Sequence, residues 1–139
     1  MTDKHHLSGC VIPDMNAFLL TILQNNRDFS SNTLDYLGRN YGTEYDAILK
    51  LAREDAALAE TLNADGEMMA QVTYAVRHEM ARTLSDIVMR RTGIATLGHP
   101  GKEVLQKVAT LAARELNWDA DKARREIAAV ENMLELPKA

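Results

Sequence analysis

The chain has 139 residues, of which 46% are hydrophobic, 26% charged and 5% aromatic, a mixture typical of a globular protein and not of a disordered one. Its net charge of −4 disfavours a general nucleic-acid binder. Its single cysteine, Cys10, excludes an internal disulfide and a cysteine zinc cluster. The longest near-apolar run, residues 17–23, is too short for a transmembrane segment, and no secretory signal pattern opens the chain. These features indicate a small protein of a reducing compartment.

Apolar residues recur every three or four positions along most of the chain, which is the spacing of one helix face. Residues 1–12 lack this spacing and are interpreted as an entry segment or interdomain linker. Residues 13–139 are predicted to form a single all-α domain, a compact array of about seven or eight short helices. The predicted helical segments are residues 13–25, 32–40, 43–53, 55–62, 67–80, 84–91, 100–116 and 119–136.

Short polar residues mark the predicted helix starts. Asp14 suits the positive end of the first helix, Ser30 or Ser31 is placed to cap the second, and Thr43 is placed to cap the third. Asp119 is placed to cap the last helix. Only about three residues separate the last two helices, so we expect them to form an antiparallel hairpin.

Two apolar stripes predict which helix faces point into the core. The segment 67–80 aligns Met69, Val72, Val76 and Met80. The last helix carries the most regular stripe in the chain, made of Ala120, Ala123, Ile127, Val130 and Leu134.

Sequence motifs for enzyme chemistry are absent. No glycines fall in the dinucleotide pattern G-x-G-x-x-G, and no phosphate-binding loop is present. His78 and Glu79 begin a zinc-protease motif, but Arg82 stands where the second histidine belongs. Asp119 and Asp121 begin a calcium loop that then lacks its glycine and its final glutamate. We therefore predict no catalytic, cofactor-binding or metal-binding residues in this chain.

The stretch from residue 74 to residue 92 mixes charged and apolar side chains across a predicted helix junction. Its charged members are Arg77, Glu79, Arg82, Asp86, Arg90 and Arg91. Asp86 and Arg90 stand four residues apart with the acid first, and Arg82 can reach Asp86 if the backbone between them is helical. Three interpretations remain open: an internal ion-pair network that locks two helices, a docking face for another domain, and a phosphate or nucleic-acid site. The first is favoured, because arginine pairs well with carboxylates at partly buried positions.

The same stretch resembles a known family. The string Tyr74-Ala-Val-Arg-His-Glu-Met-Ala-x-Thr-Leu-x-Asp-Ile-Val-x-Arg-Arg-Thr92 resembles the signature of the C-terminal helical (cap) domain of FAD-dependent (aerobic) glycerol-3-phosphate dehydrogenase. Residues 37–43 are similar to a segment upstream of that signature, and residues 102–127 are similar to the last helix pair of the family. The Leu7-Ser8-Gly9 entry is similar to the connection that follows the flavin domain.

The resemblance implies a parent enzyme that oxidises sn-glycerol 3-phosphate to dihydroxyacetone phosphate and passes electrons to FAD and then to quinone, or to oxygen in related oxidases. Its flavin and substrate residues belong to a large N-terminal part, so this chain alone is expected to bind no FAD and to be inactive. The implied partner is the N-terminal flavin domain of the same polypeptide. The implied location is the cytoplasm, with the parent a candidate for peripheral attachment to the cytoplasmic face of the membrane. Met1 then marks either an excised domain or an unusual gene boundary.

Two alternatives stay open beside the resemblance. The chain can be a free-standing helical module whose apolar grooves bind a partner helix. A homo-oligomer can also form through an exposed apolar patch.

Overall fold

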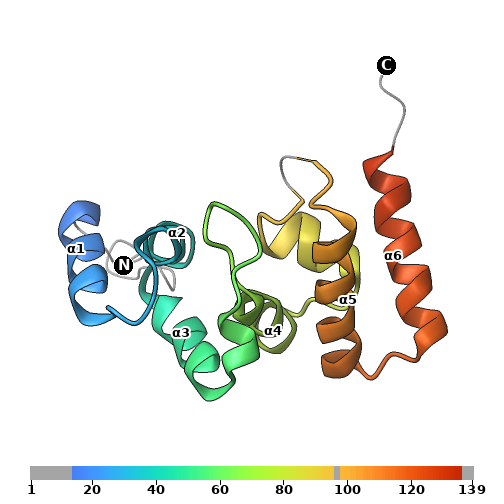
Figure 1. Ribbon diagram of the computed structural model, residues 1–139, viewed down its shortest axis with the longest axis horizontal. Coiled ribbons are helices and arrows are strands. Elements are labelled where there is room, and N and C mark those ends of the chain that lie inside the picture. The colour runs from blue at the N-terminus through green and yellow to red at the C-terminus, as the bar shows by residue number, and fades with distance from the viewer. Residues whose placement is uncertain (1–13, 96–97, 136–139) are drawn as a thin grey trace, which may run out of the picture. The chain divides into compact units, whose positions relative to one another are not determined.

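The computed structural model describes residues 14–95 and 98–135, and in these residues the secondary structure is helical (Figure 1). The six α-helices of this part of the chain are α1 (Met15–Asn25), α2 (Ser31–Tyr41), α3 (Tyr45–Glu54), α4 (Met69–His78), α5 (Lys102–Leu116) and α6 (Ala120–Leu134). An isolated bridge between Thr61 and Met68 is the only β-type pairing described. The predicted all-α fold class is confirmed, whereas the predicted entry segment, residues 1–12, lies outside the described residues.

The predicted number of helices, seven or eight, exceeds the six α-helices described. Two of the predicted segments form a 3₁₀-helix and a π-helix instead. Residues 56–59 form a short 3₁₀-helix, η3 (Ala56–Ala59). At its start the Asp55 carboxylate accepts the backbone N–H of Ala57 at 3.0 Å. Aspartate at such a position competes with a continuing α-helix. The segment near residue 86 forms a π-helix, η4 (Asp86–Arg91), in which the Thr92 hydroxyl donates to the Ile87 carbonyl at 2.7 Å.

Most predicted helix caps are present. The side chains of Asp14, Ser30 and Asp119 accept backbone N–H groups in the first turns of α1, α2 and α6. The prediction for Thr43 was wrong, because the chain leaves α2 through a 3₁₀-helix, η2 (Gly42–Glu44), that leads directly into α3. The Tyr45 N–H is bonded to the Gly42 carbonyl, so the start of α3 continues this turn without a side-chain cap.

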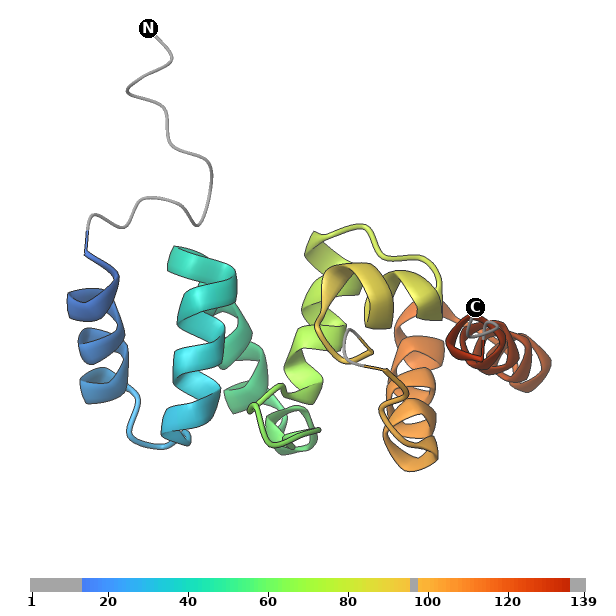
Figure 2. The ribbon, with the colours of Figure 1, turned by 90° about the horizontal axis from the view of Figure 1, so that it is seen from above.

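The chain divides into two compact units, of which the N-terminal unit comprises residues 1–68. In this unit α1 lies beside α2, as Figures 1 and 2 both show, and α2 is followed by α3. Gly38 allows α1 and α2 to approach closely, because a Cβ atom there would stand 2.6 Å from Leu19 Cδ2. The buried apolar side chains of these helices are Leu19, Ile22, Leu34, Leu37, Ile48, Leu49 and Ala52.

The C-terminal unit comprises residues 69–139. Here α4 packs against α5 and η4, and α5 packs against α6. Asn117 adopts a left-handed conformation that ends α5, and α6 then returns in the opposite direction in Figure 1, so the predicted hairpin is present. The buried apolar side chains of η4, α5 and α6 are Ile87, Val88, Leu105, Val108, Ala109, Leu111, Ala112 and Val130.

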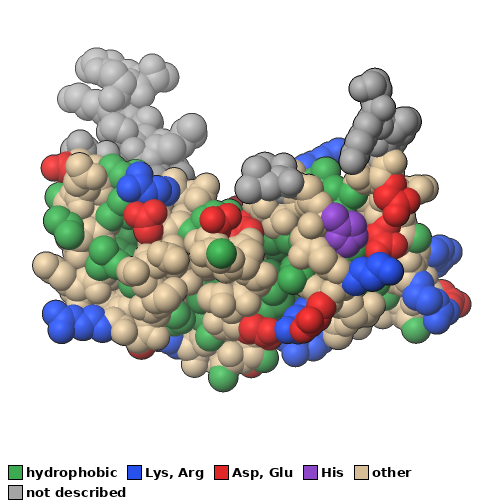
Figure 3. Space-filling view, turned by 45° about the horizontal axis from the view of Figure 1, so that its top comes forward, with side chains coloured by type: hydrophobic (Ala, Val, Ile, Leu, Met, Phe, Trp, Pro, Cys, Tyr) green, Lys and Arg blue, Asp and Glu red, His purple; other side chains and the backbone are tan. Residues whose placement is uncertain are grey.

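The predicted inward faces of two helices need correction. Met80 is 75% exposed, because α4 ends at His78 and the backbone leaves the helix before Met80. On α6 Val130 is buried, whereas Ala120 is exposed because it stands in the first turn. Charged and hydrophobic side chains are interspersed on the face drawn in Figure 3.

None of the described helices combines the length and the apolar character that crossing a bilayer requires. Histidine, cysteine, aspartate and glutamate side chains do not gather in threes at metal-binding distance within residues 14–95 and 98–135.

Candidate functional site

The connection between α4 and η4 carries most of the charged residues that the sequence singled out. It begins where the Ala75 carbonyl accepts the backbone N–H groups of Glu79 and Ala81, each at 3.1 Å. Between them Met80 adopts φ +59°, in the left-handed region. That conformation costs a residue with a side chain about 1–2 kcal/mol, and here it turns the chain sharply away from α4.

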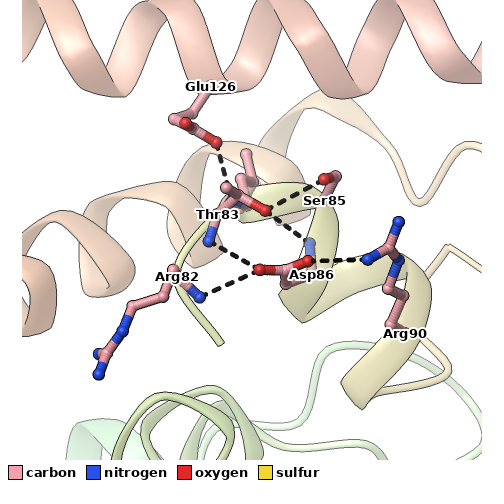
Figure 4. A network of polar contacts seen from close by, with 7 residues as sticks. Arg82, Thr83, Ser85, Asp86, Arg90 and Glu126 are labelled. Carbon is pink, nitrogen blue, oxygen red and sulfur yellow. Dashed lines mark hydrogen bonds and ion pairs between the residues drawn. The ribbon is translucent and has the colours of Figure 1, made fainter. Parts of the chain in front are cut away.

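Thr83 and Asp86 cap each other at the start of the next helical turn (Figure 4). The Thr83 hydroxyl accepts the Asp86 N–H at 3.0 Å, and an Asp86 carboxylate oxygen accepts the Thr83 N–H at 3.2 Å. The same oxygen accepts the Arg82 N–H at 3.2 Å. This reciprocal pattern is a capping box, which satisfies N–H groups that have no partner within the helix.

Hydrogen bonds lower the pKa of Asp86. The largest cause is the backbone N–H of Arg82, with further contributions from the Thr83 side chain and backbone and from the Arg90 charge, against an opposing effect of burial. Bonds of this kind favour the ionised carboxylate. Asp86 is therefore held as an acceptor by main-chain groups more than by an arginine side chain.

Glu126 on α6 joins this network from a distant part of the chain. Its side chain is 10% exposed, and one carboxylate oxygen accepts the buried Leu84 N–H at 2.9 Å. The other oxygen pairs with Lys122 Nζ at 2.8 Å. A buried carboxylate needs such partners, and the bond to Leu84 ties α6 to the start of the turn that leads into η4.

The predicted ion pairs within this stretch are only partly present. Arg90 Nη1 lies 3.5 Å from Asp86 Oδ1, and the Arg90 side chain is 76% exposed. Arg82 contacts Asp86 through its backbone N–H, while its side chain extends away from the carboxylate on the opposite side from Arg90 (Figure 4). The reason is that Arg82 precedes the helical turn, so it lacks the helical spacing that the prediction required.

The remaining predicted residues lie apart from Asp86. Arg77 makes a bidentate pair with Glu115 of α5, at 2.9 and 3.1 Å. This contact joins α4 and α5, and its carboxylate lies outside the predicted set of charged residues. Arg91 is exposed at the end of η4, and Glu79 is half-buried after α4.

Five residues between positions 80 and 91, the segment that contains the capping box, are exposed: Met80, Arg82, Met89, Arg90 and Arg91, which we call the 80–91 surface. Guanidinium groups offer forked donors for carboxylates, and methionine fills irregular apolar pockets.

Two features of this site escaped the sequence analysis. Thr83 and Asp86 stand three residues apart, which is the spacing of a capping box, so that signal was available in the sequence. Glu126 stands forty residues from Asp86 and on another helix, and no local pattern announces its bond to Leu84.

Comparisons with known proteins agree on one family. The family described as the C-terminal domain of alpha-glycerophosphate oxidase matches residues 1–123. The chain is 28% identical over 121 residues to the "Probable glycerol-3-phosphate dehydrogenase, mitochondrial" of Dictyostelium discoideum, covering 86% of this chain and 18% of the relative. It is 28% identical over 105 residues to a mitochondrial glycerol-3-phosphate dehydrogenase of Arabidopsis thaliana, covering 75% of this chain and 17% of the relative. The chain thus spans less than a fifth of the length of these relatives, and no solved structure gives a significant match.

Proposed function

The chain belongs to the family of C-terminal domains of alpha-glycerophosphate oxidase, and from this we propose that it serves as the accessory helical domain of a FAD-dependent glycerol-3-phosphate dehydrogenase. The observation that carries the proposal is the family match, which runs through both compact units. We propose that the two units act together as one C-terminal domain. The family match gives no support to the alternative of a free-standing interaction module.

The proposed parent reaction is the oxidation of sn-glycerol 3-phosphate to dihydroxyacetone phosphate, with electrons passed through FAD to quinone. The residues of this chain do not fit an FAD site, because its sequence lacks the glycine-rich loop and its described part lacks the strand–turn–helix unit that dinucleotides require. We therefore assign FAD to the N-terminal portion of the parent and derive no chemical step from the residues of this chain.

We propose that the arginine-rich stretch contributes to the contact with that flavin-binding portion. Arg77 and Asp86 already hold partners inside the C-terminal unit, which supports a structural role for them. Arg82, Arg90 and Arg91 are exposed, which supports a role in docking. A cytoplasmic location, with the parent held at the membrane surface, is also part of this proposal; the two relatives are named as mitochondrial proteins.

A two-polypeptide experiment tests this function. The chain and the flavin-binding portion of its parent are produced separately and then mixed, and oxidation of sn-glycerol 3-phosphate is followed with an artificial quinone-like acceptor. We expect the chain alone to carry no flavin absorbance and no activity, and we expect it to bind the flavin-binding portion and to raise its activity or its stability. A chain that purifies with bound flavin, or that does not bind the flavin-binding portion, would contradict the proposal.

A further inference from the structure

We propose that the 80–91 surface docks this domain onto an acidic face of the flavin-binding portion, with the Met80 side chain entering an apolar pocket there. This inference rests on the proposed function and adds the surface, its central residue and the chemistry of its partner. Three observations carry it: the backbone and exposure of Met80, the uncompensated arginines, and the π-helical turn.

Met80 has an unfavourable backbone conformation and an apolar side chain exposed to solvent. Its φ of +59° is in the left-handed region, where glycine is the favoured residue. Its side chain is 75% exposed, more than the other large hydrophobic side chains that stand exposed in the described part of the chain, Leu20, Met89 and Met133. Glycine would remove the backbone cost, and a polar residue would suit the exposure. A methionine that satisfies neither condition is explained if a partner covers it.

The arginines around Met80 carry more positive charge than the chain neutralises nearby. With Arg77 neutralised by Glu115, the charged residues that remain between positions 78 and 91 are Arg82, Arg90 and Arg91 against Glu79 and Asp86, a local charge of +1. Asp86 is bonded to two backbone N–H groups and lies 3.5 Å from Arg90, and Arg77 is paired with Glu115. The exposed guanidinium groups of Arg82 and Arg91 therefore face solvent in a region with a positive balance. Their natural partners are carboxylates, which they can hold with two parallel hydrogen bonds.

The backbone beneath this surface is held in an unusual form. Residues 86–91 form a π-helix, a rare element that is frequently found at functional sites. The Thr83–Asp86 capping box fixes its start, and Glu126 fixes the Leu84 N–H beside it. These bonds hold the main chain between Arg82 and Arg90, whose side chains extend to opposite sides of the Asp86 carboxylate (Figure 4).

The flavin-binding portion is the occupant that these observations favour. In both relatives more than four-fifths of the polypeptide lies outside the matching segment, so a domain of this family has a large neighbour in its own chain. A positive surface with methionines requires a neighbour that is acidic and has an apolar pocket. A second copy of this chain is the competing occupant, and the experiment distinguishes it.

The test measures the affinity between the chain and the flavin-binding portion by calorimetry. Met80→Ser removes the apolar side chain, and Arg82→Glu reverses one charge; we expect each to raise Kd at least about fivefold, since central interface side chains dominate binding. Arg82→Glu also reduces the salt dependence of the wild-type affinity. Met133→Ser and Arg125→Glu are the matched controls on α6, and we expect them to change Kd less than about twofold.

Met80→Gly separates docking from a structural role. Glycine relieves the left-handed backbone, so we expect the melting temperature of the chain alone to rise. The same substitution removes the docking side chain, so we expect Kd to rise as it does for Met80→Ser. A variant that is more stable and binds as tightly as the wild type would overturn the proposal.

The remaining outcomes are also decisive. If the wild-type chain binds and Met80→Ser and Arg82→Glu bind equally well, the 80–91 surface is not the contact, while the proposed function stands. If the wild-type chain does not bind at all, the proposed function itself fails. If the chain alone forms a dimer in sedimentation that Met80→Ser and Arg82→Glu disperse, a second copy is the occupant and the proposal is overturned.

Discussion

Thr83 and Asp86 hold each other in a reciprocal pair, in which each side chain accepts the backbone N–H of the other residue, at 3.0 and 3.2 Å. The pair stands where the chain enters the π-helical turn, between the exposed side chains of Arg82 and Arg90. Because η4 packs on α4 and buries Ile87 and Val88, this small cap lies at the start of an element that is anchored in the C-terminal unit. The order of the 80–91 surface therefore depends on it.

Loss of the Thr83 hydroxyl should loosen the C-terminal unit. We expect Thr83→Ala to lower the free energy of unfolding by about 1 kcal/mol, the usual cost of a lost N-terminal cap. Thr83→Ser keeps the hydroxyl and should stay within about 0.5 kcal/mol of the wild type. Urea unfolding followed by circular dichroism measures both, and equal stabilities of the alanine and serine variants would contradict the capping role.

Asp86 should make the stability of the chain depend on pH in acid. The pKa of Asp86 is lower in the folded chain than its ordinary value of 3.8, chiefly through the Arg82 N–H. The stabilisation is therefore complete above the unfolded pKa, and it is lost as the pH falls through the folded pKa. We expect the stability difference between the wild type and Asp86→Asn to be constant from about pH 5 to pH 7 and to shrink below 3.8. A difference that does not change with pH would show that the carboxylate charge is not involved.

Removal of the Glu126 carboxylate should be more costly than removal of its cation. Glu126→Ala leaves the buried Leu84 N–H without its acceptor, and we expect a loss of about 1–3 kcal/mol. Glu126→Gln keeps an acceptor oxygen and should lose less. Lys122→Ala is the matched control on the same helix, with an expected loss of about 0.5 kcal/mol or less, because the Lys122 side chain is 43% exposed and its charge is screened by solvent. Chemical denaturation measures the loss of unfolding free energy in each of the three variants. A loss for Lys122→Ala as large as that for Glu126→Ala would contradict the argument.

Gly66 and Gly98 offer a matched comparison of space at positive φ. Gly66 has φ +96°, and a Cβ atom there would stand 2.6 Å from the Thr33 backbone N, whereas Gly98 has φ +123° and open space around it. Both alanine variants bear a backbone cost, but only Gly66→Ala also meets another part of the main chain. We expect Gly66→Ala to be less stable than Gly98→Ala by at least about 1 kcal/mol in thermal unfolding. Equal losses would show that the 63–66 turn moves away from α2 without cost.

The capping box could be predicted from the sequence, whereas the contact of Glu126 could not. The spacing of Thr83 and Asp86 is a local signal, so their pairing was predictable from the sequence, although the i,i+4 relation of Asp86 to Arg90 predicts a side-chain ion pair for the same carboxylate. Met80 looked like the last member of an apolar stripe, because the stripe itself does not reveal where the helix stops. The bond from Glu126 was out of reach, since it depends on how α6 packs against the rest of its unit.

The sequence by itself determined the helical fold class, the main helices, the caps at Ser30 and Asp119 and the family resemblance. All of these follow from local spacing or from a contiguous motif, which a linear pattern contains. The tertiary structure alone decided that Glu126 is buried against Leu84 and that Met80 faces solvent. The physical reason is that burial and hydrogen-bond partners depend on where the backbone turns and on which helices then meet.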